Sequence, residues 1–458
     1  QADRIILNKD SFQALGGVVL TGFGIYPTYY KSALDKLKVD INVFTSGDYK
    51  DAVEPYLLEG MSDKAKEANS AWLQELWLIY GNTITENRGI SVESLEDYIN
   101  SYGSLLAAAG NDSAQLALNH GFVDELLSES EWREEMQSAV GRSGRTYRQV
   151  SYDDYLTEIS PSFDVPRPHM SKIAVITASG TILDGEQPSG NIGGETTSRL
   201  LRQARWDDDV KALVLRINSP GGSAAASEKI RHEIESTLLS DKPVVVSMSS
   251  YAASGGYWVS STASKIFALE STVTGSIGTF MLFPTFERSL AELGIYSDGV
   301  GTTELSGTFN LFKSIGPVFQ DTLEKSVDHT YSKFLSLVAK GRDLSLEEAE
   351  EVAKGRIWTG KTAVELGLVD AIGGLDEAIE AAAQLAGTDD YEVIHLEQTL
   401  SPGEQLVISL LNSGLQTLQH WFPVNNQIQA VSAVLPLDLL KMSESPGVYV
   451  QCLYCNVQ

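Results

Sequence analysis

Cysteine and histidine are scarce: the chain of 458 residues contains two cysteines and six histidines. The histidines occur singly, without the short spacings at which side chains hold a metal ion, so no metal site is predicted. The two cysteines, Cys452 and Cys455, form one CxxC sequence near the end of the chain. A redox pair, half of a zinc site and a local disulfide remain open for it. A tail feature with no part in the chemistry is the favoured interpretation.

Basic residues are few relative to acidic ones: 34 Lys and Arg stand against 61 Asp and Glu, a formal net charge of -27. This balance argues against nucleic acid as a partner, because nucleic-acid binding requires a basic surface. It also argues against broad docking on an anionic membrane. No apolar run reaches the length of about 18 residues that a membrane span requires. The glycine motifs of nucleotide and flavin sites are missing as well, so no cofactor is predicted.

A strand followed by a turn and a helix is the most informative pattern that is present. Val244–Val246 is an apolar, β-branched run that predicts a buried strand. A turn of small residues follows, with Ser254, Gly255 and Gly256, before an apolar helical pattern resumes. Unpaired backbone N–H groups at a helix start can hold a developing oxyanion. Ser254 is therefore a candidate nucleophile and the N–H of Gly255 a candidate oxyanion donor, although an isolated SGG sequence is more often an ordinary connection.

The preceding part of the chain repeats this pattern. Residues 213–223 read LVLRINSPGGS, and a helical pattern runs from Ala224 to Leu239. Two such turns can lie side by side at one edge of an open α/β sheet, which is where ligands of these folds bind. One turn then supplies a nucleophile and the other supplies oxyanion donors.

Four short sequences together carry a family resemblance: SPGGS (219–223), SGGYW (254–258), TGSIG (274–278) and GDYKDAVEP (47–55). They resemble the signal peptide peptidase family, also called protease IV, of the ClpP/crotonase superfamily, in its long duplicated bacterial form. The resemblance implies an α/β fold of tandem ClpP/crotonase-like domains. It further implies Ser254 as nucleophile, Lys50 as general base, a hydroxyl of Ser276 beside the lysine, and the N–H of Gly222 as second oxyanion donor.

Two pairs of segments indicate an internal repeat of a whole domain: 2–8 with 263–269, and 117–124 with 363–370. The first copy begins at the equivalent of Ala263, so it is expected to be truncated and Gln1 is not expected to be a natural start. The predicted domains follow in chain order: a truncated first copy with the lysine (1–150), a linker (151–170), a second copy with the serine (171–390) and a helical tail (391–458).

Lys50 can act as a base only when it is unprotonated, and the pKa of a free lysine is about 10.4. Burial disfavours the ammonium, and lowering the pKa to the range of about 7–8 costs roughly 4 kcal/mol. We therefore expect Lys50 in a mostly apolar pocket without a carboxylate partner, with Asp48 and Asp51 pointing away. A hydroxyl such as that of Ser276 orients the amine without raising its pKa.

Three functional hypotheses remain. The first is a serine–lysine endopeptidase that degrades cleaved signal peptides and other extended apolar peptides. For it, the resemblance implies the periplasmic side of the bacterial inner membrane, an anchor that is absent from this chain, and a homo-oligomer, with a tetramer favoured. The second is a crotonase-like acyl-CoA enzyme, which an acidic chain without a basic phosphate cluster fits poorly. The third is a non-catalytic scaffold of the same fold.

Overall fold

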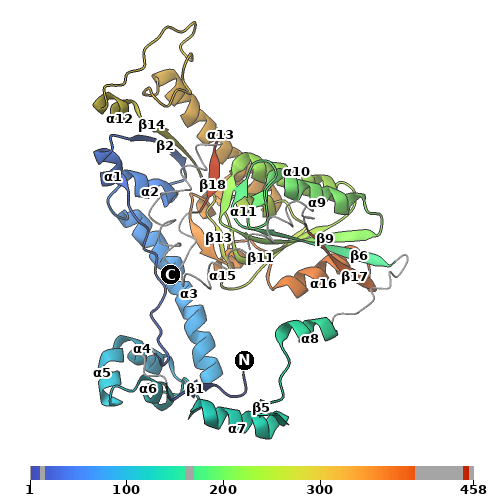
Figure 1. Cartoon of the computed structure of the whole chain (residues 1–458). Coiled ribbons are helices and arrows are strands. Elements are labelled where there is room, and N and C mark those ends of the chain that lie inside the picture. Colours follow the sequence, from blue (N-terminus) through green and yellow to red (C-terminus); the bar gives the residue numbers. More distant parts are fainter. Residues whose placement is uncertain (1, 11–15, 160–169, 398–446, 453–458) are drawn as a thin grey trace. The chain divides into compact units, whose positions relative to one another are not determined.

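The computed structural model describes residues 2–10, 16–159, 170–397 and 447–452 (Figure 1). The chain divides into two compact units, one of residues 1–24 and 73–168 and the other of residues 25–72 and 169–458. Helix α3 (Asp63–Arg88) begins in the second unit and ends in the first. The boundaries of these units differ from those of the predicted repeat copies, because the segment around Lys50 belongs to the same unit as Ser254.

The first unit is mostly helical. Its helices besides α3 are α4 (Val92–Asn100), α5 (Tyr102–Ala108), α6 (Ser113–Asn119), α7 (Glu129–Val140) and α8 (Tyr152–Ile159). Its strands are β1 (Ile6–Asn8), β3 (Glu125–Leu127), β4 (Arg142–Ser143) and β5 (Thr146–Tyr147). Strands β1 and β3 pair in parallel. Buried side chains from α4, α6 and the segment before β3 form the core of this unit, with Tyr98 fully buried.

The second unit is built on a mainly parallel sheet in the order β15-β13-β11-β9-β6-β17, with β12 beside β11 and β16 beside β12. Its long central strands are β6 (Ser171–Ser179), β9 (Val210–Ser219) and β11 (Val244–Ala253). The others are β12 (Lys265–Ala268), β13 (Val273–Gly275), β15 (Ile357–Thr359), β16 (Ala371–Ile372) and β17 (Tyr391–Leu396). The apolar runs that predicted buried strands are thus confirmed for β9 and β11.

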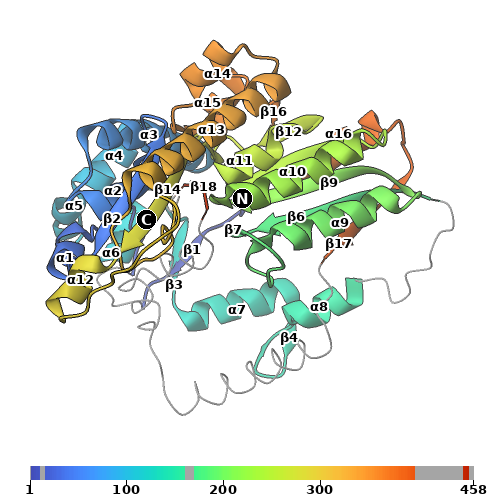
Figure 2. The same cartoon turned by 90° about the horizontal axis from the view of Figure 1, so that it is seen from above.

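Helices cover both faces of this sheet (Figures 1 and 2). The helices are α9 (Gly194–Trp206), α10 (Ala224–Leu238), α11 (Gly255–Ser260), α13 (Pro317–Arg342), α14 (Leu346–Val352), α15 (Gly360–Glu365) and α16 (Leu375–Leu385). Alternation along the strands separates two cores. Leu213 and Leu215 face the core shared with α9 and α10, whereas Ala212 and Val214 face the core shared with α16.

A second sheet, in the order β2-β14-β18-β10-β7-β8, joins segments that are far apart in the sequence. Its strands are β2 (Asp40–Ser46), β7 (Ile182–Leu183), β8 (Ile192–Gly193), β10 (Gly221–Ser223), β14 (Thr279–Thr285) and β18 (Tyr449–Gln451). Nearby lie α1 (Lys31–Lys36), the 3-10 turn η1 (Asp51–Val53), α2 (Glu54–Leu57) and α12 (Glu287–Glu292). Strand β2 pairs antiparallel with β14 along its whole length, so a strand from the first repeat copy completes a sheet of the second.

Each unit contains the same arginine–aspartate arrangement, as expected for an internal repeat. Arg88 at the end of α3 pairs with Asp124 at 2.6 Å, and Arg342 at the end of α13 pairs with Asp370 at 2.7 Å. Each aspartate also accepts a hydrogen bond from a backbone N–H at the start of the neighbouring strand, β1 or β12, at 2.7 and 2.6 Å. Both aspartates end the matched octapeptides of the sequence, so the repeat extends to side-chain contacts.

The predicted helical tail differs from the structure where the structure describes it. Residues 391–396 form β17, which pairs in parallel with β6, and residues 449–451 form β18. Both segments contain tyrosine and valine, and the first also contains isoleucine; these residues favour strands over helices. The helices expected within 406–440 lie outside the described residues.

Candidate active site

Ser254 lies between the end of β11 and the start of α11, as the sequence predicts. Its backbone has φ 55° and ψ -110°, a conformation that is costly for a residue with a Cβ. Its N–H donates to the carbonyl oxygen of Gly275 at 2.7 Å, which holds the turn in place. The serine has no exposed surface. The strained turn therefore presents the hydroxyl group at a fixed point above the sheet.

Lys50 reaches this hydroxyl group from the loop between β2 and η1. Its Nζ lies 2.8 Å from Ser254 Oγ, 3.0 Å from Ser276 Oγ and 3.0 Å from the carbonyl oxygen of Ser276. Lys50 is 5% exposed and Ser276 is 3% exposed. The structure thus brings Lys50 to two serines that lie more than 200 positions later in the sequence.

Burial lowers the pKa of Lys50 from 10.5 to about 7, and the negative charge of Asp51 opposes this shift. The two flanking carboxylates point elsewhere, as expected. Asp48 is exposed and pairs with Lys64 at 3.6 Å, whereas Asp51 accepts a hydrogen bond from Asn69 Nδ2 at 2.8 Å. Within the described ranges, no ion pair joins Lys50 to a carboxylate. The amine can therefore be neutral near neutral pH.

The pKa of the Asp51 carboxyl group is shifted as well. Burial raises its pKa to about 7, against the hydrogen bond from Asn69 and the charge of Lys50, which both lower it. Asn69 in turn accepts a hydrogen bond from Trp72 Nε1 at 3.0 Å. This chain of contacts fixes the carboxyl group beside the lysine loop, so its charge acts on Lys50 at a defined distance.

The two candidate oxyanion donors lie close together. Gly255 is the first residue of α11, and Gly222 lies in β10. A Cβ on Gly221, which directly precedes Gly222, would stand only 2.7 Å from the backbone nitrogen of Gly255 and 2.0 Å from the carbonyl oxygen of Val450. Only glycine permits this approach, so the SPGG turn brings β10 against the start of the serine helix.

The support of the lysine loop is a feature that the sequence did not reveal. Gly355 has φ +82°, and a Cβ there would stand 2.6 Å from the backbone nitrogen of Lys50. The neighbouring Lys354 accepts a hydrogen bond from the N–H of Tyr49 at 2.7 Å. A Cβ on Gly278 would stand 3.2 Å from Lys50 Cδ. Gly278 closes the TGSIG sequence, one of the four that carry the family resemblance, whereas no pattern around Gly355 indicated its role.

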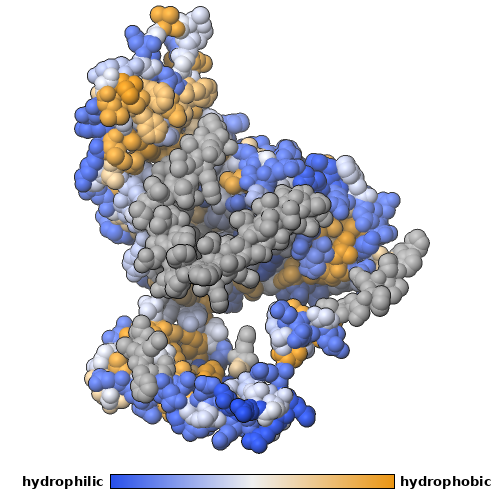
Figure 3. All heavy atoms as spheres, in the orientation of Figure 1, coloured by the Kyte–Doolittle hydropathy of each residue, from blue (hydrophilic) through white to orange (hydrophobic). Residues whose placement is uncertain are grey.

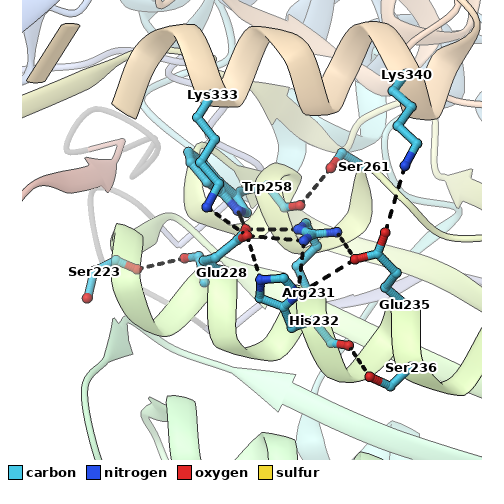
Figure 4. A network of polar contacts seen from close by, with 11 residues as sticks. Ser223, Glu228, Arg231, His232, Glu235, Ser236, Trp258, Ser261, Lys333 and Lys340 are labelled. Carbon is cyan, nitrogen blue, oxygen red and sulfur yellow. Dashed lines mark hydrogen bonds and ion pairs between the residues drawn. The ribbon is translucent and has the colours of Figure 1, made fainter. Parts of the chain in front are cut away.

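A partly buried carboxylate anchors the helix that follows Ser254 (Figure 4). Glu228 on α10 accepts hydrogen bonds from Trp258 Nε1 at 2.8 Å and from Arg231 Nε at 2.8 Å, and it pairs with Lys333 on α13 at 2.9 Å. Burial opposes ionisation, but the hydrogen bonds from Arg231, Lys333 and Trp258 lower the pKa of Glu228 to about 2. The carboxylate thus ties α11 to α10 and α13, which restrains the position of Ser254.

Metal sites and membrane spans are two further kinds of feature that the described residues do not form. Across the described parts of the chain, no three His, Cys, Asp or Glu side chains are grouped so that they could hold a metal ion. None of the helices in the described ranges combines the length and the hydropathy needed to cross a lipid bilayer.

Comparison with known proteins gives matches over nearly the whole chain. The family model described as Peptidase family S49 matches residues 1–141 and 237–389. "Protease 4" of Haemophilus influenzae is 38% identical, covering 99% of this chain and 74% of that protein. "Protease 4" of Salmonella typhi is 39% identical, covering 96% of this chain and 69% of that protein. A "Putative signal peptide peptidase SppA" of Enterococcus faecium is 34% identical, covering 42% of this chain and 56% of that protein.

The family model matches two separate segments, one in each predicted copy of the repeat. This division is consistent with duplication. Together with the mixed sheets described above, it confirms the predicted α/β class and supports the predicted tandem duplication.

Proposed function

Because this chain belongs to peptidase family S49 and is thus a serine peptidase, we propose that Ser254 is its nucleophile and Lys50 its general base. One observation carries the proposal: a lysine amine, buried and without a carboxylate partner, lies 2.8 Å from a serine hydroxyl at a strained turn. A nucleophile and its base within hydrogen-bond reach are the minimum requirement for this chemistry.

The catalytic cycle follows from the contacts. The neutral amine of Lys50 accepts the proton of Ser254 Oγ while its own N–H groups donate to the carbonyl and hydroxyl oxygens of Ser276. Oγ attacks the peptide carbonyl, and the N–H groups of Gly255 and Gly222 stabilise the oxyanion. The ammonium then gives its proton to the leaving amine. Water, activated by the same lysine, releases the acyl group.

The proposed substrates are cleaved signal peptides and other extended apolar peptides. The relative from Enterococcus faecium carries the name signal peptide peptidase. An apolar cluster that includes Phe280, Tyr56 and Val53 is buried beside the lysine loop. An extended peptide can be added to a sheet as a further strand. We place the protein on the periplasmic side of the bacterial inner membrane.

A homo-oligomer, with a tetramer favoured, belongs to the same proposal. Apolar surface gathers over α12 and the segment that follows it (Figure 3). Large apolar side chains are exposed there, and contiguous exposed apolar surface is typical of interaction sites. They are Leu293, Ile295, Tyr296, Val300, Leu305, Phe309 and Phe312. Contact with further copies of the chain would remove them from water.

A fluorophosphonate probe tests the nucleophile directly. We expect one adduct per chain, located on Ser254 by peptide mass spectrometry, and none on Ser254→Ala. Ser260→Ala is the matched control, because Ser260 is a buried serine on the same helix and donates only to the carbonyl of Gly256, at 2.7 Å. Labelling that persists in Ser254→Ala would refute the assignment.

Substitution of Asp51 tests the base. The charge of Asp51 raises the pKa of Lys50, so Asp51→Asn should let the amine lose its proton at lower pH. The acid limb of the pH dependence of kcat/KM for an apolar fluorogenic peptide, expected near pH 7 in the parent, should therefore move to lower pH. Asp48→Asn, at an exposed residue, should leave the limb in place. If the acid limb of Asp51→Asn lies at a higher pH than that of the parent, the result would contradict the assignment of Lys50 as the base.

A further inference from the structure

The short strand β18 lies between β10 and β14, and each of these strands would otherwise present an unpaired edge to the other. It runs antiparallel to both neighbours, with Gly222 opposite Val450 and Phe280 opposite Tyr449. Two adjacent hydrogen bonds extend the pairing: Ala224 N–H to the carbonyl of Val448 at 3.1 Å, and Cys452 N–H to that of Pro220 at 2.6 Å. The gap between β10 and β14 is thus one strand wide.

The side chains of β18 point into two different apolar sites. Val450 is fully buried in the core shared with α10 and α11, which includes Tyr257. Tyr449 packs against Phe280, with ring centroids 6.0 Å apart, and belongs to the same buried cluster as Ala52 and Val53, two and three residues after Lys50. Alternating side chains held in pockets on either side are typical of a peptide added to a sheet edge.

The backbone of β18 lies at the candidate oxyanion donors. The carbonyl oxygen of Val450 and the backbone nitrogen of Gly255 both lie within 2.7 Å of the point where a Cβ on Gly221 would stand. The register places Val450 opposite Gly222, the other candidate donor. A scissile carbonyl of a substrate would have to occupy this same place.

Ser254 has no exposed surface in this arrangement, and β18 contacts α11, the helix that begins directly after it. A peptide cannot reach a fully buried hydroxyl group. The nucleophile therefore becomes available only when a segment that covers it moves. The segment that fills the one-strand gap between β10 and β14 is β18, which contains only three residues.

We propose that β18 is an autoinhibitory strand, which occupies the peptide-binding groove in the register of a substrate and must leave before a peptide is cleaved. This inference rests on the proposed function, because it takes Gly222, Gly255 and Ser254 as the catalytic centre. It also describes the preferred ligand: an extended peptide with an aromatic side chain where Tyr449 lies and a small β-branched one where Val450 lies.

Val450→Asp tests the inference in the full chain. A carboxylate in the apolar site of Val450 disfavours the docked strand. If the groove is open for about a tenth of the time or less in the parent, freeing it should raise the rate of Ser254 labelling and kcat/KM by about tenfold or more. Leu239→Asp, the same kind of change at a residue that is 83% exposed, is the matched control and should leave both rates unchanged.

A second measurement uses the parent chain and so does not depend on the folding of a variant. Amide hydrogen exchange of residues 448–452 should be slow in the free protein and fast after a peptidyl fluorophosphonate has reacted with Ser254 and filled the groove. A blocked peptide of residues 447–451 should also inhibit Val450→Asp competitively, whereas a scrambled peptide should not.

The outcomes separate the two proposals. Slow exchange of 448–452 after complete labelling, or equal labelling rates in the parent and in folded Val450→Asp, would overturn autoinhibition and leave the peptidase mechanism standing. A lack of Ser254 labelling in the parent, Val450→Asp and Leu239→Asp alike would overturn the mechanism and the autoinhibition with it.

Discussion

Lys50→Met should lower kcat/KM for an apolar fluorogenic peptide by about 10⁴-fold, because general base catalysis contributes up to about this factor. Methionine fills a similar volume in the same apolar pocket but has no group that accepts the proton of Ser254. The three hydrogen bonds from Nζ to Ser254 and Ser276 are lost with the amine. Initial rates at several substrate concentrations measure the effect.

Lys64→Met is the matched control, because Lys64 lies in the same region but has an exposed side chain, which pairs with Asp48 at 3.6 Å and lies over the ring of Tyr49 at 5.3 Å. It should keep the parental rate. If Lys50→Met also keeps that rate while Ser254→Ala loses it, the nucleophile stands and another group must act as the base.

The stability of Lys50→Met distinguishes lost chemistry from lost folding. Burial lowers the folded-state pKa of Lys50 to about 7 from 10.5, so between these values the unfolded chain binds more protons and stability rises with pH. Below pH 7 the parent bears the full cost, on the order of 5 kcal/mol. Lys50→Met should therefore unfold at a higher temperature than the parent at pH 6, and a lower one would contradict the burial of a charged lysine.

Gly355→Ala should lower kcat/KM by about 10²-fold, because a displacement of about 1 Å at a catalytic group costs about that much. The new Cβ would stand 2.6 Å from the backbone nitrogen of Lys50 and 2.9 Å from its Cα. These are backbone atoms, so the clash can be relieved only by moving the lysine loop. KM should change less than kcat, since the amine moves relative to Ser254 rather than to the peptide.

Gly367→Ala separates this effect from backbone strain. Gly367 has φ +73°, close to the +82° of Gly355, but a Cβ there meets nothing within 4 Å. Both variants should lose about 1 kcal/mol of stability from the left-handed conformation, and only Gly355→Ala should lose activity. Equal activity in the two variants would mean that Gly355 does not position Lys50.

Local patterns were enough to predict the parts of the site that form short, continuous units. The strand before Ser254, the helix after Gly222 and the α/β class are confirmed, because each depends on apolar runs and turn residues that are adjacent in the sequence. The membership of the protease IV family is likewise confirmed by the matched relatives. The roles of Lys50 and Ser276 remain predictions.

Long-range pairing was beyond the reach of the sequence. Strand β2 pairs with β14 although some 240 positions separate them, and no periodicity indicates which edge a strand will join. Strand β18 contains only three residues, too few to show a pattern, and the segment before it suggested helices. The close approach of Gly355 to Lys50 depends on the fold alone, since a single glycine with positive φ looks like any turn glycine.

The placement of Lys50 and Ser254 on one chain, 204 positions apart, determines how the site responds to dilution. Two groups fixed by one fold face each other at an effective concentration that the amount of protein in solution does not change. Groups supplied by separate chains would instead meet through a bimolecular step, and the catalytic rate per chain would fall as the protein concentration falls. The covalent link between the repeat copies thus makes assembly of this pair independent of expression level.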